Sequence, residues 1–116
     1  MTQDELLDLP GVKDRYETAR ARNPDKRLRL VETAGGVIIL RQPTVPEFRM
    51  WEEALYGDDA KQQSSASRLL LQSICVDLDA AGFAQLLKDY PGITMDPGVL
   101  LEMRKVAGAA KESALK

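Results

Sequence analysis

The sequence of 116 residues contains no histidine. Histidine is the commonest general base and metal ligand near neutral pH, so neither a Ser-His-Asp nor a Cys-His catalytic arrangement can be built. A zinc site would have to rely on one cysteine and carboxylates, which is not a usual ligand set. Gly35-Gly36 is followed by an apolar run rather than by the Lys-Ser/Thr of a phosphate-binding loop. We therefore expect no enzymatic activity, no metal and no cofactor.

Cysteine and long apolar runs are also scarce. The single Cys75 excludes an intrachain disulfide and fits a reducing compartment. It lies in an apolar stretch, so we interpret it as a buried, inert thiol rather than a reactive one. The longest apolar run, Val37–Leu40, is far too short to span a membrane, and the first residues lack a signal peptide. We expect a cytoplasmic protein with no membrane partner.

Charge of one sign does not dominate. The 16 Lys and Arg nearly balance the 18 Asp and Glu, which gives a net charge of −2, whereas a dedicated nucleic-acid binder usually carries a strongly basic face. A basic cluster does occur within 20–29; its members are Arg20, Arg22, Lys26, Arg27 and Arg29. It could contact phosphates or an acidic partner. We favour a solvated helix end and a charge-protected edge strand, because no aromatic residues interleave it.

The order of elements predicts an α+β fold that is mainly helical. We expect an N-terminal helix over 10–22, one β-hairpin over about 28–41, and then about four short helices. The length fits one domain, 1–116. Residues 1–9 receive no element, and about 1–9 and 111–116 are expected to be flexible ends.

Residues 35–57 predict a turn, a strand and a capped helix in succession. The glycine pair favours a hairpin turn, and the β-branched run Val37–Leu40 favours a strand. Thr44 and Glu47 form a capping box that starts a helix. The apolar residues of this helix recur at helical spacing and are Phe48, Trp51 and Leu55.

Three further helices are expected over about 59–76, 79–88 and 97–110. Their inward residues are predicted to be Leu70, Leu71, Ile74, Cys75 and Leu78 in the first, Phe83, Leu86, Leu87 and Tyr90 in the second, and Leu100, Met103, Val106, Ala107 and Ala110 in the third. Asp77 and Asp79 could be a pair of catalytic carboxylates. Helix capping and loop solvation explain them better, with Asp79 as the N-cap.

The apolar strand raises the question of what covers it. A two-stranded hairpin alone is marginal in water, so Val37–Leu40 must pack against the following helices or against a partner. Aromatic and Met residues are enriched at interfaces. The candidate partner-binding residues are Ile38, Leu40, Met50 and Trp51, and burial in the core is the alternative for each.

A family resemblance rests on two short patterns. The first is Val37-Ile-Ile-Leu-Arg41-Gln-Pro43-Thr44, followed by Glu47-Phe48 and Trp51, and the second is Leu86-Leu-Lys-Asp-Tyr-Pro-Gly92. Over about residues 29–110 the chain resembles the small tail assembly chaperones of long-tailed bacteriophages and prophages. Residues 1–25 are not covered, and no functional residue is carried over.

The resemblance implies a non-catalytic role. Such chaperones bind the long tape-measure protein and shield its hydrophobic helices until the tail tube polymerises around it. It also implies self-association into homo-oligomers, contact with other tail proteins, a place in the host cytoplasm and absence from the mature virion. The alternative is a small phage regulatory or nucleic-acid-associated protein that uses the basic cluster.

Overall fold

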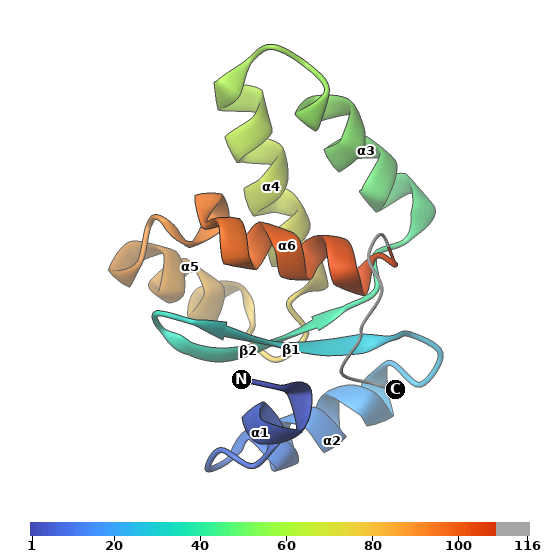
Figure 1. The fold of residues 1–116 in the computed structure, drawn as a ribbon, viewed down its shortest axis with the longest axis vertical. Helices are drawn as coiled ribbons and strands as arrows, with labels where there is room; N and C mark the ends of the chain where they lie inside the picture. Colours follow the sequence, from blue (N-terminus) through green and yellow to red (C-terminus); the bar gives the residue numbers. More distant parts are fainter. Residues whose placement is uncertain (109–116) are drawn as a thin grey trace.

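The computed structural model describes residues 1–108, which form a mainly helical α+β fold (Figure 1). The predicted fold class, with its N-terminal helix, hairpin and following helices, is therefore confirmed. The elements in chain order are α1 (Gln3–Leu7), α2 (Val12–Arg22), β1 (Leu28–Thr33), β2 (Gly36–Arg41), α3 (Val45–Leu55), α4 (Ala60–Ile74), α5 (Ala80–Asp89), the short 3-10 helix η1 (Ile93–Met95) and α6 (Pro97–Val106). Residues 111–116, expected to be flexible, lie outside the described residues.

The hairpin forms the middle layer, with α1 and α2 on one face and α6 on the other, while α3 and α4 project away from it as a helical hairpin (Figure 1). Successive residues of a strand point to opposite faces. Ile38 and Leu40 accordingly belong to the larger core, which the later helices complete, whereas Val37 and Ile39 belong to the smaller core under α1 and α2. The apolar run is continuous because the chain's own helices cover both faces.

The two glycines of the hairpin turn have different functions. Gly36 has φ of 109°, a conformation that side chains disfavour. Gly35 has no such angle, but a Cβ there would lie 2.5 Å from Leu86 Cδ1, so glycine lets the turn approach α5. The turn was predicted correctly, yet only one of the two glycines supplies positive φ.

Helix starts agree well with the capping residues. The Thr44–Glu47 capping box is formed, and the side chains of Asp79 and Asp96 cap α5 and α6. A second capping box, Thr2–Glu5, starts α1, a helix that the sequence analysis did not predict. A helix of five residues has little stability alone. It is held instead by tertiary contacts, including burial of Leu6.

Several details differ from the sequence prediction. The first long helix begins at Val12 rather than at Pro10, because Gly11 before it adopts a left-handed conformation. Tyr90, predicted to point inward, is 40% exposed, since α5 ends at Asp89 and the chain leaves helical geometry there. The other predicted inward residues that are only half-buried are Leu78, Leu87, Leu100 and Ala107. Ala110 lies beyond the described residues. Within 1–108, no helix has the length and apolar character needed to cross a membrane.

Candidate functional site

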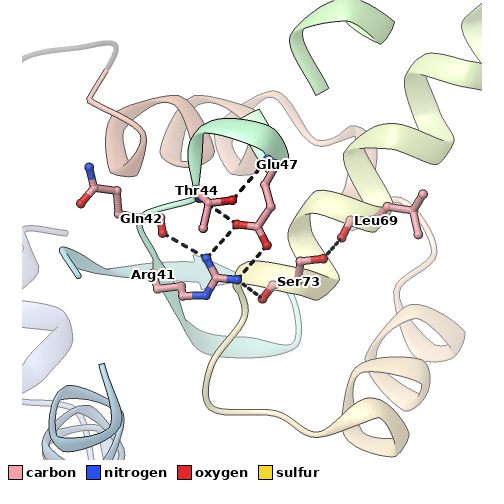
Figure 2. Close-up of polar contacts among 6 residues, drawn as sticks. All are labelled: Arg41, Gln42, Thr44, Glu47, Leu69 and Ser73. Atoms are coloured by element: carbon pink, nitrogen blue, oxygen red, sulfur yellow. Dashed lines mark hydrogen bonds and ion pairs between the residues drawn. The ribbon is translucent and has the colours of Figure 1, made fainter. Parts of the chain in front are cut away.

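Arg41 fixes where α3 and α4 sit relative to the sheet (Figure 2). Its two terminal nitrogens donate to the two carboxylate oxygens of Glu47, each at 2.9 Å. They also donate to the carbonyls of Gln42 and Ser73, both at 3.1 Å. One side chain thus joins the end of β2, the first turn of α3 and the last turn of α4.

The charges of this pair reinforce each other. Hydrogen bonds from Arg41, above all, lower the pKa of Glu47 from 4.5 to about 2, although burial opposes the shift. The hydrogen bond with Glu47 raises the pKa of Arg41. A bidentate pair of this kind is directional as well as strong. At neutral pH this charged pair therefore helps to orient the base of the α3–α4 hairpin.

The facing sides of α3 and α4 are joined through Trp51. Its indole nitrogen donates to Ser67 Oγ at 2.9 Å, and both residues are 2% exposed. Phe48 packs edge-on against the indole, with ring centroids 5.9 Å apart. Burying an aromatic ring together with a satisfied N–H gives a strong and specific contact.

Beside this contact, the surface between α3 and α4 forms an apolar groove. It has a volume of about 270 Å³ and is lined by Met50, Trp51, Ala66, Leu69 and Leu70, with Glu47 and Ser73 at the α3–α4 base. Met50 is 68% and Leu69 54% exposed, which is unusual for large apolar side chains next to one another. We call these lining residues the α3–α4 groove and treat it as the candidate partner-binding site.

The structure separates the four predicted partner-binding residues. Met50 is exposed on the α3–α4 groove, and Trp51 forms part of its buried lining. Ile38 and Leu40 are 3% and 0% exposed and lie in the larger core, where a partner cannot reach them in this fold. Leu69, which lines the α3–α4 groove, was not predicted from the sequence. The signal was the run 69–71, since three consecutive helical residues cannot all face one core.

A second cavity borders α3 on its other side. It has a volume of about 350 Å³ and is lined by residues of α3, the exposed Tyr56 and Arg104 of α6. Glu52 and Arg104 make this cavity more polar than the α3–α4 groove. A binding experiment therefore has to distinguish a partner bound in this cavity from one bound in the α3–α4 groove.

Asp77 is not the solvated loop residue that the sequence suggested. Its side chain is 3% exposed and forms an ion pair with Arg15 of α2. Its Oδ1 accepts the N–H of Ile39 at 3.0 Å. Asp79, in contrast, caps α5 as expected, accepting from Gly82 N at 2.7 Å. The two carboxylates therefore have separate structural partners.

Cys75 is buried, as predicted. Burial and the neighbouring Asp77 carboxylate raise the pKa of its thiol to about 12. A thiol that stays protonated is a poor nucleophile and a poor ligand. In the part of the chain that the structure describes, no three His, Cys, Asp or Glu residues cluster as a metal site would require.

The basic cluster is not one continuous surface. Arg29 is 8% exposed and forms an ion pair with Glu102 of α6. Arg20, Arg22 and Arg27 are exposed. The exposed basic surface at the end of α2 is therefore smaller than the sequence suggests.

Comparisons with known protein families, with curated proteins and with solved structures found no match.

Proposed function

We propose that this protein is a non-catalytic tail assembly chaperone of a long-tailed bacteriophage or prophage, and that the α3–α4 groove binds an amphipathic helix of the tape-measure protein. The family resemblance of residues 29–110 supports the role. The observation that carries the site is the pair of exposed apolar side chains, Met50 and Leu69, on either side of one groove.

A groove between two packed helices suits a third helix. An amphipathic helix presents apolar residues at i, i+3, i+4 and i+7, and such a row can lie along a hydrophobic groove. Methionine is unbranched and adapts to differently shaped partners. Met50 would therefore allow one small protein to hold several helices of similar character. The Arg41–Glu47 pair keeps the groove's walls in place without a ligand.

The proposed function carries further expectations about the protein in the cell. We propose that it works in the host cytoplasm, associates with itself and with other tail proteins, and is absent from the mature virion. Each of these rests on the resemblance.

The test is capture of the tape-measure protein encoded by the same phage or prophage. Co-expressed with a helical segment of it, the wild-type chain should purify as a complex. Leu69→Glu places a charge in the α3–α4 groove and should weaken binding at least tenfold, in line with loss of an apolar anchor at an interface. Leu101→Glu is the matched control, because Leu101 is 46% exposed on α6.

Two results would contradict the proposal. One is a folded chain that ignores every tape-measure segment supplied. The other is capture that Leu69→Glu and Leu101→Glu weaken equally, which would place binding outside the groove. A gel shift with DNA or RNA at low salt would support the alternative function instead.

A further inference from the structure

The outer edges of β1 and β2 differ in the hydrogen-bond partners of their backbone groups. Along β2, the N–H of Val76 donates to the carbonyl of Ile39 at 2.9 Å, and Asp77 Oδ1 accepts the N–H of Ile39 at 3.0 Å. Arg15 donates to the carbonyl of Val37. A β-bridge between Leu40 and Cys75 continues the contact. Backbone groups and the half-buried Arg15–Asp77 ion pair therefore close this edge.

Along β1, the register turns the backbone groups of Leu28, Leu30 and Glu32 outward, away from β2. Leu30 is hydrogen-bonded there by the side chain of Gln3: Gln3 Nε2 donates to its carbonyl at 2.9 Å, and its N–H donates to Gln3 Oε1 at 2.8 Å. The outward backbone groups of Leu28 and Glu32 make no hydrogen bond within residues 1–108. One side-chain amide thus occupies the position of a neighbouring strand's peptide group.

Two cavities lie beside β1, one between the strand and the helices α1 and α2, the other between the end of the strand and the segment from Asp89 to Val99. A cavity of about 300 Å³ lies beside Leu28 and Leu30, where Gln3 also lines it. A cavity of about 440 Å³ lies beside Glu32 and the turn that follows it. An edge strand with unpaired backbone groups is a template for another strand.

We propose that β1 pairs with β1 of a second copy of this chain, antiparallel and with Leu30 opposite Leu30. A hydrogen-bonded pair in an antiparallel ladder exchanges two N–H···O bonds and is symmetric about a two-fold axis. Leu30 would then keep the number of hydrogen bonds that it now makes with Gln3. Leu28 and Glu32 are equally far from Leu30, so each would pair with the other in the second copy and gain bonds.

The second copy is favoured as the occupant because one register satisfies all three residues in both chains. The product is a four-stranded antiparallel sheet, which is more stable than an isolated hairpin. In this arrangement the Gln3 side chain acts as a latch, since it must leave the edge before a strand can enter. Only the Gln3 side chain has to move, so α1 can keep Leu6 in the smaller core.

The inference rests on the proposed function for its expectation of self-association and names the surface responsible. It does not use the α3–α4 groove. Helix capture measured with Leu69→Glu and dimerisation measured at β1 can therefore succeed or fail separately.

The first test removes the hydrogen bonds between the Gln3 side chain and Leu30. Sedimentation equilibrium should show that Gln3→Ala dimerises at least about tenfold more tightly than the wild type, because each chain loses hydrogen bonds that compete with pairing. Asp8→Ala, which alters an exposed side chain at the end of α1 outside the cavity beside Leu28 and Leu30, is the matched control and should leave association unchanged. A folded Gln3→Ala that associates no more than the wild type overturns the proposal.

The second test asks which residues of the two β1 strands lie opposite each other, and it leaves Gln3 unchanged. In the double variant Leu28→Cys, Glu32→Cys, oxidation should yield a covalent dimer, because opposed residues of a ladder lie within disulfide reach. Glu32→Cys alone is the control, since the two copies of residue 32 would lie about 14 Å apart across the two-fold axis. A dimer that never forms the 28–32 crosslink, or an edge that binds only strands of other proteins, overturns the proposal.

Discussion

Arg41 and Glu47 meet through two parallel hydrogen bonds of 2.9 Å at the point where β2 gives way to α3 (Figure 2). The same carboxylate completes the capping box by accepting from Thr44 N at 2.8 Å. Arg41 also reaches the carbonyl of Ser73 at the end of α4. One ion pair therefore couples the start of a helix to the placement of the helical hairpin that carries the proposed binding site.

This pair predicts how stability depends on pH. The folded state holds the pKa of Glu47 at about 2, below its ordinary 4.5. Its contribution is therefore complete above about pH 4.5 and is lost as the pH falls toward 2. Glu47→Gln should cost about 1–3 kcal/mol at pH 7. The difference in unfolding free energy between wild type and variant, measured in urea, should shrink between pH 4.5 and 2.

Glu53→Gln changes an exposed carboxylate on the same helix and is the control. It should shift stability by less than about 0.5 kcal/mol. A wild-type-minus-Glu47→Gln difference that stays constant across this pH range would contradict the account of the pair.

Replacing aspartate with asparagine should lower the stability of the protein by very different amounts at the two aspartates before α5. Asp77→Asn removes the negative charge opposite Arg15 and should destabilise the protein by about 2–3 kcal/mol. Asp79→Asn should cost less than about 0.5 kcal/mol, because Asn and Asp cap helices almost equally well. Urea unfolding of both variants decides this, and equal losses would be inconsistent with the buried role of Asp77.

Alanine in place of glycine should reveal where the hairpin turn is strained. Gly36→Ala must hold φ of 109° and should cost about 1–3 kcal/mol. Gly92→Ala is the matched control, since Gly92 has φ of −81° and open space where the methyl group would lie. It should be neutral or stabilising by up to about 1 kcal/mol. Thermal unfolding of the pair measures the contrast, and a tolerated Gly36→Ala would count against the turn.

Cys75 should be almost inert while the protein is folded. Its buried thiol has a pKa near 12, so little thiolate exists at pH 8. Reaction with a thiol-specific chromogenic disulfide should be at least about 100-fold slower in the native state than in urea. Rapid native labelling would mean that the segment following α4 opens readily.

The sequence predicted what depends on near neighbours. The Thr44–Glu47 capping box, the N-cap at Asp79 and the spacing of the apolar residues are all local patterns, and the helices that they predict are present. The contacts that were missed join residues far apart in the sequence. Arg15 and Asp77 are separated by 62 positions, and Arg29 and Glu102 by 73. Composition cannot distinguish such partners from solvated charges, which is why Asp77 and Arg29 were misinterpreted.

The candidate site was predicted only in part for the same reason. Met50 and Trp51 were identified by residue type. In the structure they differ in exposure, because Met50 is 68% exposed and Trp51 only 2%. Whether Ile38 and Leu40 were covered by a partner or by the chain depended on how α3 to α6 fold back, which periodicity does not specify. Leu69 becomes part of a site only when α4 is oriented against α3.

The central claim, that the α3–α4 groove binds an amphipathic helix, is tested most directly by methyl NMR on the labelled protein during titration with a tape-measure helix. The account predicts saturable shift changes concentrated at the methyl groups of Met50, Ala66 and Leu69, with little change at Leu101. Shift changes at Leu101 and around Tyr56 that leave Met50 and Leu69 unmoved, or no changes at all, would contradict it.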